Sequence, residues 1–194
     1  MTALETLLRH ISTELEDVRV GFALVGGLAV SARSEPRFTR DADIAVAVAN
    51  DAEAERLVRI LQGRRYSVVT LVEQDAVGRL ATVRLARASE SAVLDLLFAS
   101  SGIEPEVVAA AESIELLRDL RVRVATTAHL IALKVLSRDD LARPQDLVDL
   151  RALLRVASAS DLERASAAVA LISERGYHRG RDLHREFESL LRPT

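Results

Sequence analysis

The chain has 194 residues, with 26 basic and 29 acidic side chains and a formal net charge of −3 at pH 7. This balance excludes a protein that coats nucleic acid by charge alone, because such a protein would be strongly basic. The absence of cysteine excludes disulfides, thiolate zinc sites and cysteine nucleophiles. An aromatic share of 3% argues against a surface that stacks the bases of single-stranded nucleic acid.

The apolar runs of the chain are short. The run 44–49 has the length of a strand and not of a membrane span. The N-terminus shows no basic segment followed by an apolar stretch, so no secretory signal is visible. We therefore expect a soluble, cytoplasmic protein that does not contact a membrane.

Helices and strands are mixed in the first two-thirds of the chain. Apolar spacing and capping residues predict helices at 3–18, 28–32 and 50–61, with strands at 20–25 and 41–49.

Three further strands follow in succession. Their alternating, β-branched character predicts that they pair as neighbours in one sheet, and they lie at 66–72, 79–85 and 92–99. A helix is predicted from Pro105 to about 113, and a hairpin or edge element is predicted at 114–117 and 121–126.

From residue 127 onward the pattern is helical, and helices are predicted at 127–137, 144–157, 160–175 and 181–191. The order of elements predicts an α/β (α+β) protein, with a mixed sheet and flanking helices followed by a helical bundle. The predicted domains are residues 1–125 and 126–194. Successive strands without intervening helices argue against a doubly wound sheet.

Two aspartates, Asp41 and Asp43, begin a predicted strand. Residues at i and i+2 of a strand project from the same face, so the two carboxylates lie side by side. Their repulsion at a partly buried position amounts to a few kcal/mol, about what an effective dielectric near 20 gives, and a divalent cation would offset it. The alternative is a pair of solvated aspartates in a loop.

Gly26 and Gly27 stand between a buried strand and a short helix. Glycines at this point let backbone N–H groups approach a phosphate at the helix N-terminus. A tight turn that needs a positive φ is the alternative.

Asp95 interrupts the apolar run 92–98. A carboxylate in the middle of an apolar strand is expensive unless it is paired or binds a metal. The two interpretations are a functional acid and an ion pair with an arginine.

The order of these motifs resembles the polymerase-β-type nucleotidyltransferase superfamily. The resemblance narrows to the AbiEii/MenT-type nucleotidyltransferases, the toxins of type IV toxin–antitoxin systems, over roughly residues 20–155. The motifs that carry it are Gly26-Gly27, Arg37-x-Thr39-x-Asp41-x-Asp43, Asp95-Leu-Leu-Phe, Leu133-Lys134-Val-Leu and Arg143-Pro-Gln-Asp146-Leu-Val-Asp149.

The resemblance implies a nucleotidyltransferase-type sheet and the transfer of a nucleoside monophosphate from a nucleoside triphosphate to RNA, in particular to the 3′ end of tRNA. It implies that Asp41 and Asp43 hold Mg²⁺ or Mn²⁺. Asp95 would be a second-metal ligand or the base for the acceptor hydroxyl. The N–H groups after Gly27 would hold the triphosphate, and a cognate antitoxin would be a partner.

Lys134 is the one lysine of the sequence and interrupts an apolar helix. A compact ammonium is a strong point charge for a phosphate, and the position matches the family's motif lysine. A lysine whose charged end reaches solvent from the edge of the core is the alternative.

Asp146 and Asp149 are neighbours on a helix because they are three residues apart. Asp146 can be explained by its place in the first turn, which makes Asp149 the better catalytic candidate. Asp146 stays a candidate nucleotide contact, and the family pattern does not decide between the two. Arg37 is a candidate phosphate contact. Thr39 is a candidate nucleotide contact or modification site. The basic stretch 175–185 is interpreted as a solvated helix face rather than an RNA surface.

Two other functions remain open at this stage. One is a small-molecule adenylyltransferase, for example one that modifies an aminoglycoside, although few aromatic residues are available to line a site for a cationic drug. The other is a non-catalytic binding module, against which the retention of Asp41, Asp43, Asp95 and Lys134 argues.

Overall fold

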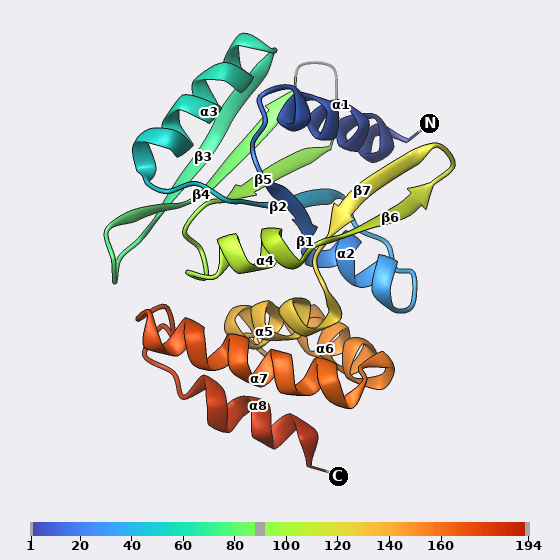
Figure 1. The fold of residues 1–194 in the computed structure, drawn as a ribbon, viewed down its shortest axis with the longest axis vertical. Coiled ribbons are helices and arrows are strands. Elements are labelled where there is room, and N and C mark those ends of the chain that lie inside the picture. The colour runs from blue at the N-terminus through green and yellow to red at the C-terminus, as the bar shows by residue number, and fades with distance from the viewer. Residues whose placement is uncertain (1, 88–91, 193–194) are drawn as a thin grey trace.

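The computed structural model describes residues 2–87 and 92–192. In these residues the strands are β1 (Phe22–Val25), β2 (Asp41–Val46), β3 (Tyr66–Gln74), β4 (Arg79–Arg87), β5 (Val93–Leu97), β6 (Glu112–Leu117) and β7 (Leu120–Val124). The helices are α1 (Ala3–Asp17), α2 (Gly26–Arg33), α3 (Asp51–Gly63), α4 (Glu104–Ala110), α5 (Thr127–Ser137), α6 (Pro144–Val156), α7 (Ala159–Glu174) and α8 (Leu183–Leu191) (Figure 1).

The strands form one mixed sheet in the order β3-β4-β5-β2-β1-β7-β6. Strand β2 lies at its centre, antiparallel to β1 and parallel to β5. The predicted pairing of three successive strands is confirmed, because β3, β4 and β5 are antiparallel neighbours. All four residues of β1 are buried, as expected for a central strand.

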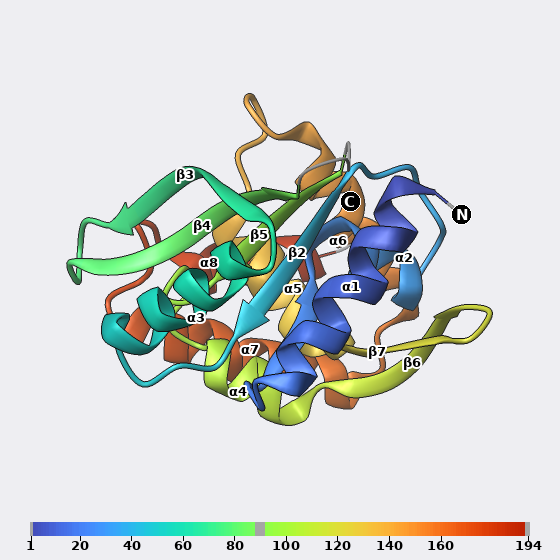
Figure 2. The same ribbon diagram turned by 90° about the horizontal axis from the view of Figure 1, so that it is seen from above.

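Helices cover the sheet unequally. Helices α1 and α3 lie above it, and α5–α8 form a bundle below it, with α2 and α4 in between (Figures 1 and 2). Helix α5 is the most apolar element of the bundle, and its buried side chains include Leu130, Ile131 and Val135. The expected fold class, a mixed sheet with flanking helices and a following helical bundle, is confirmed.

Several element boundaries differ from prediction by one to three residues. Helix α2 begins at Gly26 rather than at residue 28. Strand β2 ends at Val46, and beyond it Ala47 donates its N–H to the carbonyl of Gly21. Helix α4 ends at Ala110 because Ala111 is already extended and leads into β6. None of the described helices is long and apolar enough to cross a membrane.

Candidate active site

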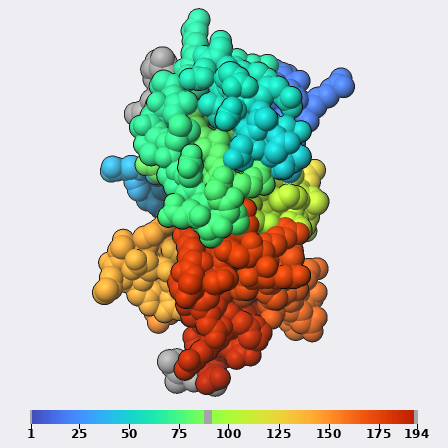
Figure 3. All heavy atoms as spheres, turned by 90° about the vertical axis from the view of Figure 1, so that its left-hand side faces the viewer, coloured from blue at the N-terminus to red at the C-terminus, as the bar shows by residue number. Residues whose placement is uncertain are grey.

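A cleft of about 770 Å³ lies between the sheet and the C-terminal helices. Figure 3 views the side of the molecule on which β3 and β4 meet the C-terminal residues. Most of the predicted site residues line this cleft, namely Gly26, Gly27, Arg37, Thr39, Asp41, Asp43, Asp95, Lys134 and Asp146. Asp149 lies just behind the cleft wall and is 1% exposed. The structure thus brings together residues more than 100 positions apart in the sequence.

Asp41 and Asp43 stand on the cleft side of β2, whereas Ala42 and Ile44 point into the core and are fully buried. Asp43 is directly opposite Asp95 in the parallel pairing of β2 with β5. Burial raises the pKa of Asp43 to about 6, with further contributions from the negative charges of Asp95 and Asp41. The sheet wall of the cleft therefore carries carboxylates that repel one another.

Position 26 needs a glycine because of its backbone conformation and because the side chain of Asp43 lies close to it. Its φ is +64°, and a Cβ placed on it would lie 1.9 Å from Oδ2 of Asp43. A Cβ on Gly27 would lie 2.4 Å from Nη2 of Arg37. The Gly-Gly pair thus makes room for two charged side chains of the site. It also begins α2, whose N-cap residue Val25 offers no side-chain hydrogen bond to the first N–H groups.

Asp95 is paired with an arginine that the sequence did not single out. Arg84 donates from Nε to Oδ1 of Asp95 (2.8 Å) and from Nη2 to Oδ2 (2.7 Å). The ion-pair alternative for Asp95 is therefore what the structure shows. Each carboxylate oxygen of Asp95 thus accepts one hydrogen bond from Arg84. Within residues 2–87 and 92–192, no group of three or more His, Asp or Glu side chains is placed to hold a metal ion.

Lys134 lies at the centre of an ion network. Its Nζ is 2.6 Å from Oδ1 of Asp146 and 2.8 Å from Oδ2 of Asp149, and the lysine is 7% exposed. Ser137 and Arg143 contact the second oxygen of Asp146. Both aspartates therefore form ion pairs with Lys134.

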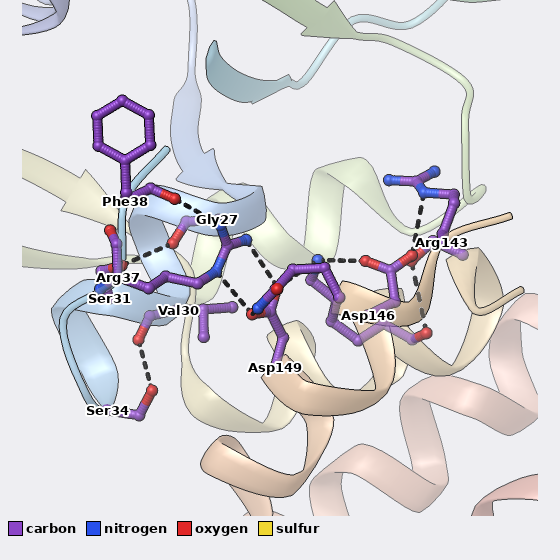
Figure 4. A network of polar contacts seen from close by, with 12 residues as sticks. Gly27, Val30, Ser31, Ser34, Arg37, Phe38, Arg143, Asp146 and Asp149 are labelled. Carbon is purple, nitrogen blue, oxygen red and sulfur yellow. Dashed lines mark hydrogen bonds and ion pairs between the residues drawn. The ribbon is translucent and has the colours of Figure 1, made fainter. Parts of the chain in front are cut away.

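Arg37 joins the loop before β2 to this network (Figure 4). It donates to both oxygens of Asp149, from Nε at 2.7 Å and from Nη2 at 2.8 Å. Burial would raise the pKa of Asp149, but hydrogen bonds from Arg37 and Lys134 outweigh it and hold that pKa below its usual value. Two-point arginine–carboxylate pairs fix orientation as well as distance, so Arg37 is held in place.

Besides Arg84, two more cleft arginines were not among the predicted site residues, namely Arg143 and Arg179. Within the part of the chain that the structure describes, no anion pairs with Arg179. Burial and the neighbouring charges of Arg143 and Arg181 lower its pKa. Its signal in the sequence was the basic stretch 175–185. There Arg175 and Arg181 do pair with Glu106 and Glu186, as a solvated face would, but Arg179 turns toward the cleft.

Solved structures with this fold are nucleotidyltransferase-like. A nucleotidyltransferase-like antigen from Paracoccidioides brasiliensis superposes with a TM-score of 0.55 at 17% identity, over 95% of this chain and 92% of that one. The antibiotic-resistance factor ANT(2")-Ia, bound to adenylyl-2"-tobramycin, superposes with a TM-score of 0.57 at 17% identity, over 90% of this chain and 99% of its own. At these identities the likeness shows the fold, which is that of nucleotidyltransferases.

The model of one protein family, the nucleotidyl transferase AbiEii toxins of type IV toxin–antitoxin systems, matches residues 6–193. The chain belongs to this family, as the motifs of its sequence predicted. Among curated proteins, none matches the chain.

Proposed function

We propose that this protein transfers a nucleoside monophosphate from a nucleoside triphosphate to an RNA acceptor, the 3′ end of a tRNA, and acts as the toxin of a type IV toxin–antitoxin pair. The observation that carries the proposal is the cleft itself. Asp41 and Asp43 stand on its sheet wall, and Lys134, Arg143 and Arg179 stand on its helical wall. Such an enzyme would work in the cytoplasm, where its substrates are, with a cognate antitoxin as partner.

The carboxylate pair suits a hard divalent cation. Asp41 and Asp43 present oxygen ligands on one face of β2, and burial together with the negative charges of Asp95 and Asp41 raises the pKa of Asp43 to about 6. These two residues would hold Mg²⁺ or Mn²⁺. The cation would supply Lewis-acid stabilisation of the phosphate oxygens during transfer.

The helical wall suits a triphosphate. Arg179 and Arg143 present guanidinium groups to the cleft, and the Nζ of Lys134 has three N–H donors of which the two carboxylates take two. The uncapped N–H groups at the start of α2 lie at the same cleft. An acceptor hydroxyl would form a bond to the α-phosphorus while the bond to pyrophosphate breaks.

The direct test is transfer of each labelled nucleoside triphosphate to total tRNA in the presence of Mg²⁺. We expect labelled tRNA with the wild type and none with Asp41→Asn. Asp119→Asn is the matched control, because its side chain is 89% exposed at a distant turn. Unchanged transfer by Asp41→Asn would contradict the assigned role of Asp41.

A second candidate is a small-molecule adenylyltransferase. It is favoured by the fold shared with ANT(2")-Ia and with the lincosamide adenylyltransferase LnuA, the latter at a TM-score of 0.50 and 14% identity over 79% of this chain and 98% of its own. Incubation with ATP and aminoglycosides or lincosamides distinguishes the two. Modified drug without labelled tRNA would favour this candidate. Absence of nucleotide binding would favour a non-catalytic module.

A further inference from the structure

The third acid of the site, Asp95, is held by a matched partner on the next strand. Arg84 of β4 and Asp95 of β5 are directly opposite in the antiparallel register. The guanidinium meets the carboxylate edge to edge, with two hydrogen bonds of 2.8 and 2.7 Å. Because both residues are anchored in the sheet, the pairing is a property of strand register and not of a mobile surface contact.

Arg84 also lies beside the other carboxylates of the cleft. Its Nη2 is 3.9 Å from Oδ2 of Asp41, and Asp43 is the register partner of Asp95. The side chain of Arg84 is 44% exposed, whereas that of Asp95 is 12% exposed. The guanidinium therefore covers Asp95 and faces the open cleft.

Charge balance decides what else this wall can hold. The three negative charges of Asp41, Asp43 and Asp95 equal in size the summed positive charge of one guanidinium and one divalent cation. A second divalent cation on Asp95 would lie against the guanidinium of Arg84, which already donates one hydrogen bond to each carboxylate oxygen, so the two positive charges would repel each other. Arg84 has five N–H donors and gives two to Asp95, which leaves donors for a phosphate oxygen.

We propose that Arg84 occupies the place of a second metal ion at this site, so that the protein binds one divalent cation with its nucleotide and uses Arg84 as the second positive charge on the transferred phosphate. Asp95 is then a positioning residue that holds Arg84. The inference rests on the proposed function and sharpens it.

The test counts the Mn²⁺ ions bound in the complex of the whole protein with a non-hydrolysable nucleoside triphosphate analogue. The count is obtained from the electron paramagnetic resonance signal of the Mn²⁺ that stays free. We expect one Mn²⁺ per complex in the wild type. In Arg84→Gln, which frees Asp95, we expect two. Arg79→Gln is the control, because Arg79 lies on the same strand but pairs with Asp51 outside the cleft, and we expect one.

Two Mn²⁺ in the wild type would overturn the inference and leave the proposed function intact. One Mn²⁺ in a folded Arg84→Gln would overturn it too, because Arg84 would not be what keeps a second cation out. No binding of nucleotide or Mn²⁺ by the wild type would remove the proposed function itself. The wild-type count decides the matter even if the variant fails to fold.

Discussion

The two walls of the cleft handle charge in different ways. On the sheet wall, burial and then the negative charges of Asp95 and Asp41 raise the pKa of Asp43 to about 6. On the helical wall, two buried aspartates pair with Lys134 and with Arg37 of the loop before β2, so the charges largely cancel inside the protein. An added cation would therefore stabilise the sheet wall, whereas the ion pairs of Lys134 and Arg37 fix the side chains of the helical wall. Arg143 and Arg179 add positive charge at the surface of that wall.

The largest expected effect lies on the sheet wall. Asp43→Asn should lower the rate of nucleotide transfer by roughly 10³-fold, the order seen when one preorganised electrostatic group is lost. Asp75→Asn, at the turn between β3 and β4, serves as the control. The measurement is the initial rate at saturating Mg²⁺. A rate within a few-fold of the wild type would mean that the wall needs no paired carboxylates.

On the helical wall, a substitution in the ion network should first of all lower the free energy of unfolding. Lys134→Met leaves Asp146 and Asp149 buried with one cation fewer, and loss of one partner from a buried ion pair costs about 3–5 kcal/mol. Arg151→Met, on the exposed side of α6, should change the free energy of unfolding by less than about 0.5 kcal/mol. Urea unfolding of both variants measures the difference. Equal stability would show that the network is not structural.

The sheet wall should also make the stability of the protein depend on pH. The pKa of Asp43 is about 6 in the folded protein against 3.8 for an ordinary aspartate, so its ionisation opposes folding. This penalty is absent below about pH 4, grows between about pH 4 and 6, and persists above. It amounts to at most about 3 kcal/mol.

Asp43→Asn should therefore raise the free energy of unfolding at pH 8 and have much less effect at pH 4. Urea unfolding of this variant and of the wild type at the two pH values is the measurement. The same gain at both would show that the carboxylate is not destabilised by its surroundings.

The smallest expected effect concerns Arg179. Arg179→Ala should raise the KM for the nucleotide by about tenfold with little change in kcat, as expected for a lost hydrogen bond to a charged group. Arg185→Ala, an exposed residue on α8, should leave KM unchanged. If kcat falls and KM stays unchanged, Arg179 acts on the reaction rather than on nucleotide binding.

Local patterns were enough to predict much of this protein. The period of two in a strand placed Asp41 and Asp43 on one face, and Gly26-Gly27 marked the junction between β1 and α2. Pro144 and the apolar spacing around it located α6 to within a residue. These features depend on backbone geometry over a few residues, which the sequence by itself determines.

Only the tertiary structure decided which side chains meet. Arg84 faces Asp95 because β4 and β5 pair in one register, and a shift of one residue would separate them. Asp149 meets Arg37, 112 positions earlier in the chain, because α6 packs beside α2. Arg179 reaches the cleft because the segment between α7 and α8 folds back toward it. Such contacts depend on register and packing between distant elements, and no local periodicity encodes them.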